Sequence, residues 1–311
     1  MILSASRRTD IPAFFTDWFF NRIAEGFLLV RNPMNPHQIG RINLSPEVVD
    51  CIVFWSKNPV KMINRLETLQ AYSFYFQFTI TGYGQKLEPN VPQCQDVINT
   101  FVNLSRSVGK DRVILRYDPI ILTDVHDIKY NACNFERIAS QLHGQTHRCV
   151  ISFVDMYKKT MRNMASLKLS EITQEQMIEL SVLLKNICLK YDMELTSCAE
   201  IADLAAYGIT HGKCIDDKLI EEISGFRLDV DKDTTQRAEC GCVASIDIGA
   251  YNTCAHECLY CYANFNHAQV HRNCAAHDPV SPLLFVTITQ GDKVYESKVA
   301  SCRDVQSNLF R

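Results

Sequence analysis

The 311-residue sequence lacks several features that would assign it to a familiar class of protein. No apolar run approaches the ~20 residues that a membrane-spanning helix needs. The first residues do not combine a basic segment, a long apolar core and a cleavage site, as a secretion signal does. The net charge of −3 excludes an overall basic field of the kind that attracts nucleic acid. Internal repeats and low-complexity segments are also missing, and we expect a globular cytoplasmic protein.

The motifs of common hydrolases and nucleotide-binding enzymes are missing as well. The sequence contains no GxxxxGK phosphate loop, no HExxH zinc motif and no GxSxG nucleophile elbow. Familiar phosphoryl-transfer, metalloprotease and serine-hydrolase schemes are therefore disfavoured.

Cysteine is what the sequence has in quantity: 14 residues, nine of them between Cys198 and Cys302. Without an export signal, this number indicates metal or redox chemistry rather than a disulfide framework. The densest group is a CxxxCxxC loop formed by Cys254, Cys258 and Cys261. Three thiolates on one short loop can bind three irons of a cubane [4Fe–4S] cluster, which leaves one iron open for a substrate or cofactor.

Two simpler interpretations of the loop stay open. His267 and His271 follow it at a spacing of four and could complete a zinc site with its cysteines. Each cysteine taken singly could also be a small buried apolar residue. Cys274 and Cys302 receive no role.

The loop resembles the signature of the radical SAM enzymes, because Tyr260 precedes its last cysteine and Tyr262-Ala-Asn264 follow it. The resemblance implies that the three cysteines bind a [4Fe–4S] cluster whose open iron binds S-adenosylmethionine, with Tyr260 near the adenine. It further implies reductive cleavage of that cofactor to a 5′-deoxyadenosyl radical, which abstracts hydrogen from a substrate. A reductant protein such as flavodoxin or ferredoxin would supply the electron.

The position of the loop narrows the resemblance. Most radical SAM enzymes carry it after the first barrel strand, whereas here it lies about fifty residues before Arg311. Together with Ser6-Arg-Arg-Thr-Asp10 and Phe54-Trp-Ser-Lys-Asn-Pro59, this placement resembles an uncharacterised bacterial domain-of-unknown-function family with a C-terminal CxxxCxxC motif. The similarity covers nearly the whole chain and names no substrate.

Short apolar runs alternate with helical patterns along the first two thirds of the chain. Most of the runs are continuously apolar, as is typical of parallel strands covered on both faces. Six strands are predicted, at Ile2–Ser6, Cys51–Trp55, Phe74–Ile80, Arg112–Tyr117, Cys149–Val154 and Glu194–Ser197. We expect an α/β fold with a partial (β/α)6 barrel, which the resemblance also implies, and a doubly wound open sheet is the alternative.

Apolar residues at helical spacing predict the main helices. They lie at Pro12–Glu25, around Val97–Val108 and at Gln174–Leu189. Two further runs, Phe27–Arg31 and Gln38–Asn43, flank a turn rich in proline and asparagine and predict a hairpin.

The pattern changes after Leu204. Residues 1–204 are predicted to form the barrel and residues 205–311 a cysteine-rich tail. The tail is expected to pack over the strand ends rather than to fold independently, with a short strand within Ser245–Ala250.

Polar residues follow the predicted strands, at the end where active sites of such folds lie. Arginines there can form forked hydrogen bonds to a carboxylate or phosphate. We predict that catalysis uses Arg116, Asp118 and Cys198. We predict that cofactor binding uses Arg7, Arg8, Asp10, Lys57, Asn58, Thr79 and Glu200.

A second group of cysteines consists of Cys198, Cys214, Cys240 and Cys242. Four thiolates could bind zinc or an auxiliary iron–sulfur cluster. Two alternatives stay open: some of these residues are only buried thiols, or one of them is an exposed reactive thiol that serves as a redox relay.

The last residues, with Gln306, Leu309 and Phe310, resemble the QxxLF-type peptide that docks proteins onto the bacterial sliding clamp. The alternative is that the two apolar residues pack on the body of the protein.

Three functions follow from these patterns. The first is a radical SAM enzyme with an unidentified substrate. The second is a radical SAM enzyme that repairs or modifies nucleic acid. It rests on the docking-like tail, the arginines and a loose similarity to the spore photoproduct lyase branch. The third is a non-enzymatic binding module that zinc or a cluster holds together.

Overall fold

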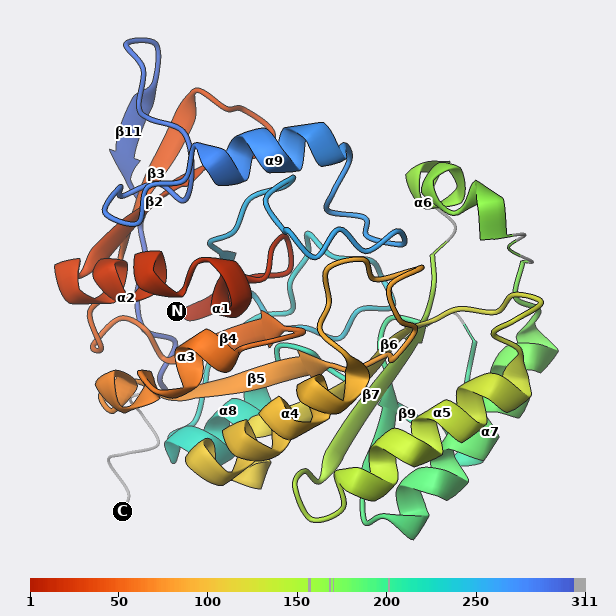
Figure 1. Ribbon diagram of the computed structural model, residues 1–311. Helices are drawn as coiled ribbons and strands as arrows, with labels where there is room; N and C mark the ends of the chain where they lie inside the picture. The colour runs from red at the N-terminus through yellow and green to blue at the C-terminus, as the bar shows by residue number, and fades with distance from the viewer. Residues whose placement is uncertain (156–157, 168, 170, 201, 305–311) are drawn as a thin grey trace.

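The computed structural model describes residues 1–155, 158–167, 169, 171–200 and 202–304, and its centre is an eight-stranded sheet in which every neighbouring pair is parallel (Figure 1). The strand order is β10-β1-β4-β5-β6-β7-β8-β9. The strands are β1 (Ile2–Ala5), β4 (Cys51–Ser56), β5 (Phe74–Thr79), β6 (Val113–Ile120), β7 (Arg148–Phe153), β8 (Glu194–Ser197), β9 (Thr210–His211) and β10 (Ile246–Asp247).

The six predicted strands are confirmed as β1, β4, β5, β6, β7 and β8. From β1 to β9 the order in space follows the order in sequence, so successive crossovers advance in one direction, as in a barrel. A doubly wound sheet would reverse direction part-way. Among the described residues no ladder joins β9 to β10, so the sheet is open. These two edge strands flank the six strands predicted for the barrel.

Nine helices lie between or after these strands in the described part of the chain. They are α1 (Ile11–Phe14), α2 (Thr16–Glu25), α3 (Val60–Ile63), α4 (Cys94–Val108), α5 (Ile128–Gln141), α6 (Lys158–Asn163), α7 (Gln174–Lys190), α8 (Asp217–Ser224) and α9 (His267–Ala275). The amphipathic helices α4 and α7 match the predicted ones, and α5 and α7 run side by side along the sheet (Figure 1).

The predicted helix over Pro12–Glu25 is wrong in one respect, because it is two helices. Asp10 caps α1 by accepting a hydrogen bond from the Ala13 N–H at 2.9 Å. Phe15 then leaves helical geometry, with φ −128° and ψ 28°, before α2 begins. Gly26 ends α2 in the left-handed conformation at φ 74°, which glycine adopts readily.

Alternating strand residues face two different cores, because successive side chains of a strand point to opposite faces. In β4, Ile52 and Phe54 pack with the helices, whereas Cys51 and Val53 pack with residues of the tail. The tail core includes Ile215 and other buried residues of the segment from Cys214 to Val243. The face of the sheet away from the main helices is thus covered by the cysteine-rich tail.

The predicted hairpin is confirmed as β2 (Phe27–Arg31) and β3 (Gln38–Asn43), which pair antiparallel. A strand near the end of the tail, β11 (Lys293–Glu296), adds to β3 in a parallel ladder. The short strand expected within Ser245–Ala250 is β10. Two strands of the tail, β10 and β11, therefore pair with N-terminal strands. The boundary at Leu204 stays a prediction.

In the part of the chain that the structure describes, none of the helices has both the length and the apolar character needed to cross a membrane. The clamp-like peptide with Gln306, Leu309 and Phe310 lies outside the described residues.

Candidate active site

A cavity of about 460 Å³ lies at the carboxyl ends of the parallel strands, within the size range of ligand-binding sites. The strand ends and the loops that follow them supply one part of its wall, and the tail supplies the rest. All the predicted site residues line it except Asn58 and Glu200. The Asn58 N–H donates to the Ser56 hydroxyl at 3.0 Å. The Glu200 carboxylate accepts a hydrogen bond from the Phe153 N–H at 2.8 Å, and burial raises the pKa of Glu200 to about 7.

The loop of Cys254, Cys258 and Cys261 borders the cavity with all three cysteines. Backbone contacts close the loop: the Asn252 N–H donates to the Ala263 carbonyl at 3.0 Å, and the Cys261 N–H to the Cys258 carbonyl at 3.0 Å. All three are free thiols. Burial raises the pKa of each of them, so binding a metal centre there would release protons.

A buried histidine joins the cysteine loop to the start of the barrel. His256 Nε2 lies 2.9 Å from Asp10 Oδ2, and the ring packs edge-on against Phe14 at 4.6 Å between centroids. Asp10 also accepts hydrogen bonds from the Ser56 hydroxyl at 2.7 Å and the Lys57 N–H at 2.8 Å. Asp10 therefore lines the cavity but uses its oxygens to hold the loop in place.

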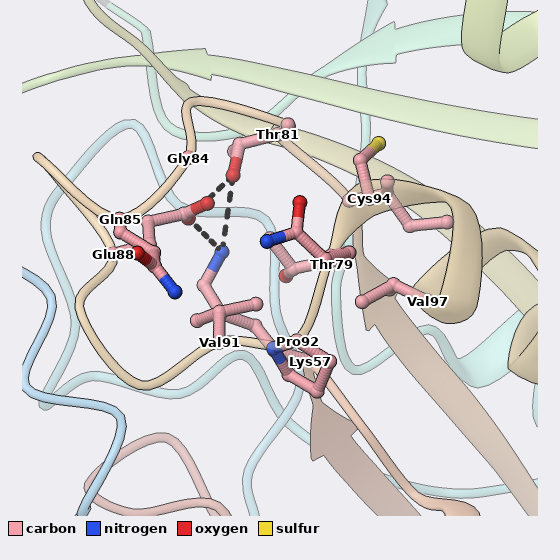
Figure 2. A pocket seen from close by; sticks show the side chains of 13 residues that line it. Lys57, Thr79, Thr81, Gly84, Gln85, Glu88, Val91, Pro92, Cys94 and Val97 are labelled. Atoms are coloured by element: carbon pink, nitrogen blue, oxygen red, sulfur yellow. Dashed lines mark hydrogen bonds and ion pairs between the residues drawn. The ribbon is translucent and has the colours of Figure 1, made fainter.

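A buried carboxylate fixes the other side of the loop. Glu88 accepts a hydrogen bond from Lys57 Nζ at 2.8 Å and another from the Thr81 hydroxyl (Figure 2). It also accepts one from the hydroxyl of Tyr260 in the cysteine loop. Burial disfavours the charged forms of both residues. The positive charge of Lys57 outweighs this effect and lowers the pKa of Glu88, and the negative charge of Glu88 raises the pKa of Lys57. Tyr260 was predicted to lie near an adenine, and its hydroxyl donates a hydrogen bond to Glu88. Lys57 Nζ lies 5.6 Å from the centre of the Tyr260 ring.

A smaller cavity of about 110 Å³ adjoins this carboxylate (Figure 2). Lys57 and Thr79 line both cavities. The loop between β5 and α4, which carries Glu88, also contacts the cysteine loop through the backbone, since the Leu259 N–H donates to the Leu87 carbonyl at 2.9 Å.

An ion pair at the end of β6 also lines the cavity. Arg116 donates to Asp118 through Nε at 2.9 Å and through Nη2, and the Ser152 hydroxyl also donates to Asp118. Burial would raise the pKa of Asp118, but Arg116 outweighs this and lowers it. Two of the predicted catalytic residues are therefore paired with each other.

The third predicted catalytic residue, Cys198, lies with the second group of cysteines. Its sulfur is 3.0 Å from the sulfur of Cys214, and Arg116 Nη1 donates to Cys214 Sγ at 2.8 Å. Cys240 and Cys242 line the same cavity. The structure thus brings all four of these cysteines to the cavity.

The zinc interpretation of the loop has less geometric support. His267 and His271 lie on α9 and both contact the carboxylate of Glu257, at 3.2 and 3.0 Å. Neither histidine lines the cavity. Across the described residues, no three His, Cys, Asp or Glu side chains are already arranged to hold a metal ion, which applies to a cluster on the three cysteines as much as to zinc.

Several residues at the site escaped the sequence analysis. Glu88 and His256 were missed because nothing local distinguishes a buried polar residue in a loop. Gln77 and Trp55 lie in strands, and the sequence suggested that they were core residues. In the structure Trp55 lines the cavity, and Gln77 Nε2 donates a hydrogen bond to the Cys214 carbonyl at 2.8 Å. Their alternation with buried phenylalanines is a signal that could have found them.

Comparison with known proteins gives a family but no activity. A family model described as "Domain of unknown function (DUF1848)" matches residues 2–263, which include the strands of the main sheet and the cysteine loop. No curated protein matches the chain.

Proposed function

The chain belongs to the family described as Domain of unknown function (DUF1848), and we propose that it is a radical SAM-type enzyme acting on an unidentified substrate. One observation carries the proposal: the three cysteines of the CxxxCxxC loop border one large cavity at the carboxyl ends of parallel strands. In folds of this type that edge of the sheet is where substrates bind.

The donor set fits a [4Fe–4S] cluster with one open iron. Cys254, Cys258 and Cys261 offer three thiols to one cavity, and three thiolates are one fewer than a fully ligated cluster needs. Bound there, a reduced cluster would supply the electron that cleaves S-adenosylmethionine to methionine and a 5′-deoxyadenosyl radical. We propose a flavodoxin- or ferredoxin-type protein as the source of that electron.

Neighbouring residues of this chain would hold the cysteine loop rigid. His256 links the loop to Asp10 through a hydrogen bond, and Tyr260 links it to Glu88 in the same way. Both histidine and tyrosine are buried, so water is excluded from these contacts. Rigid placement of ligands is what a reactive centre requires of its supporting residues.

Basic side chains along the cavity suit an anionic group. Arg8 lines the cavity with its guanidinium carbon 5.3 Å from the centre of the Tyr251 ring, and Lys57 lines it beside the loop. A guanidinium can bind a carboxylate through two hydrogen bonds, as the methionyl end of the cofactor would require. We assign Arg8 to cofactor binding and Arg116 with Asp118 to the substrate side, whereas Lys57 is already paired with Glu88.

The nucleic-acid hypothesis gains no specific support from the described residues. Arg116 is paired with Asp118 and Cys214, and Arg7 lies 3.8 Å from Asp233.

The test is cofactor cleavage by protein that is purified and reconstituted without oxygen. With dithionite as reductant, the wild-type chain should convert S-adenosylmethionine to methionine and 5′-deoxyadenosine. Cys258→Ala should abolish the conversion. Cys133→Ala, which alters an exposed cysteine on α5, is the matched control and should retain it. A reconstituted iron–sulfur cluster in wild-type protein with no cleavage product would defeat the proposal.

A further inference from the structure

We propose that Cys198, Cys214, Cys240 and Cys242 form a second metal site, in which four thiolates bind either a zinc ion or an iron–sulfur cluster. The site uses none of the cysteines of the CxxxCxxC loop. It therefore does not depend on the proposed radical chemistry, although it borders the same cavity.

The four thiols converge from three separate segments. Cys198 follows β8, Cys214 lies between β9 and α8, and the other two lie in the loop before β10. The sulfurs of Cys198 and Cys214 are 3.0 Å apart. Cys242 contacts the side chains of both Cys214 and Cys240, so the four thiols form one continuous row.

The sulfurs of Cys198 and Cys214 are already closer together than two ligands of one metal ion need to be. Four sulfurs around one zinc ion at about 2.3 Å lie roughly 3.8 Å from one another. As a row, the thiols do not yet surround one point, in keeping with the lack of a ready-made three-ligand group among the described residues. Rotation of the side chains would complete the site, and all four cysteines lie outside helices and strands.

The surroundings supply the positive charge that such a site requires. Four thiolates around a divalent ion carry a net charge of −2, and a buried charge needs compensation. Arg116 donates to Cys214 Sγ at 2.8 Å. Arg7 lines the same cavity as these cysteines, and the charges of Cys242 and Cys214 act on its guanidinium. Arg7 Nη2 is buried, with no hydrogen-bond partner among the described residues.

The two guanidiniums flank one indole. Their central carbons lie 5.3 Å (Arg116) and 5.4 Å (Arg7) from the ring centre of Trp55. Trp55 itself packs against the core that contains Cys214, Cys240 and Cys242. The cationic groups are therefore held in place beside the thiols by packing.

Four protein ligands leave no open position on the metal, which is the pattern of a structural site. The centre would join the end of β8 to the tail segments that precede α8 and β10. Because metal binding to such a site contributes directly to folding, the covering of this face of the sheet would depend on it.

The test removes the first site and asks whether metal remains. The parent variant is Cys254→Ala/Cys258→Ala/Cys261→Ala, purified without oxygen and then offered zinc, or iron with sulfide. It should retain about one zinc per chain or, for a cluster, iron and sulfide in similar amounts. Adding Cys214→Ala and Cys242→Ala should remove that metal. Adding Cys188→Ala, a buried cysteine on α7, is the matched control and should not.

A folded parent variant that binds neither zinc nor iron with sulfide overturns the proposal, and so does metal that survives the two added replacements. Cys198→Ala is a milder replacement than the other two, because this side chain is only partly buried, and the variant should still fold. It should lower both the metal content and the thermal unfolding temperature. Failure of the radical chemistry looks different, since it would abolish cofactor cleavage in wild-type protein while the parent variant still binds metal.

Discussion

The Oδ2 atom of Asp10 lies 2.9 Å from Nε2 of His256, although 246 positions separate these residues in the sequence. The same carboxylate caps α1 and accepts a hydrogen bond from Ser56 at the end of β4. One buried side chain thereby fixes the start of a helix, the end of a strand and the cysteine loop. The contact between Asp10 and His256 therefore helps to position the cysteine loop, together with the loop's own backbone.

His256→Ala should loosen the cysteine loop. A buried hydrogen bond to a charged group contributes about 1.5–3 kcal/mol, so we expect the free energy of unfolding to fall by roughly 2 kcal/mol. Less iron should be retained after reconstitution, because the three ligands are no longer held together. Urea unfolding and iron analysis measure the two effects. His37→Ala is the control, since the His37 side chain is 70% exposed. Equal iron retention by both variants would show that the loop does not need this contact.

Glu88→Gln should remove a pH-dependent part of the stability. The pKa of Glu88 is lowered in the folded protein, so its contribution is present above its ordinary value of 4.5 and is lost as the pH falls below that. The pKa of Lys57 is raised, so its contribution is present below 10.5 and is lost as the pH rises through the folded value. Between these limits the wild-type protein should exceed the variant in free energy of unfolding.

The Glu88 effect is measured as the difference between the two proteins in urea at each pH. Both should carry the three alanine replacements in the cysteine loop, so that acid release of a cluster does not contribute. The difference should be largest near neutral pH and shrink toward pH 3. A difference that stays constant from pH 3 to pH 7 would mean that Glu88 is not held ionised by Lys57.

The strands of the main sheet could be predicted because they are long and apolar on both faces. Cys51–Ser56 and Phe74–Thr79 are buried almost throughout, and such runs stand out from any surface segment. The edge strand β9 has two residues, which is too short for any periodicity to register, and its pairing depends on tertiary contact with Ser197 rather than on local preference. The equally short β10 was expected within Ser245–Ala250, but its pairing beside Ser4 of β1 depends on tertiary contacts that the local sequence does not show.

The chemistry of the site was visible only where residue types are unusual or stand at strand ends. The cysteines and Arg116 meet one of these conditions. Glu88 meets neither: it lies in an irregular loop, and its partner Lys57 is 31 positions away. The pairing of Arg116 with both Asp118 and Cys214 was equally hidden, because it depends on how the tail folds over the sheet.

Gly249→Ala should disturb the junction between β10 and the first loop of the barrel. A Cβ atom at this position would lie 2.0 Å from Ser6 Oγ and 2.5 Å from Ser6 Cβ. Ser6 cannot easily yield, because its hydroxyl donates to Asp247 at 2.6 Å. Overpacking of this kind costs about 1–3 kcal/mol. Thermal unfolding measures the loss, and Gly291→Ala, whose Cβ would meet nothing nearer than 3.8 Å, is the control. Equal unfolding temperatures for the two variants would contradict the close approach.

Arg116 and Asp118 should behave as a coupled pair. Asp118 is 21% exposed, so removing one partner of this mostly buried ion pair should cost at most about 3–5 kcal/mol, the value for a fully buried pair. Arg116→Gln and Asp118→Asn should therefore each destabilise the protein strongly, whereas the double replacement should cost much less than their sum. The difference is the interaction energy of the pair, and for residues in one network it reaches about 0.5–3 kcal/mol. Urea unfolding of the four proteins completes the cycle. Strict additivity would mean that Arg116 is held chiefly by Cys214 and Gln77, its other hydrogen-bond partners, rather than by Asp118.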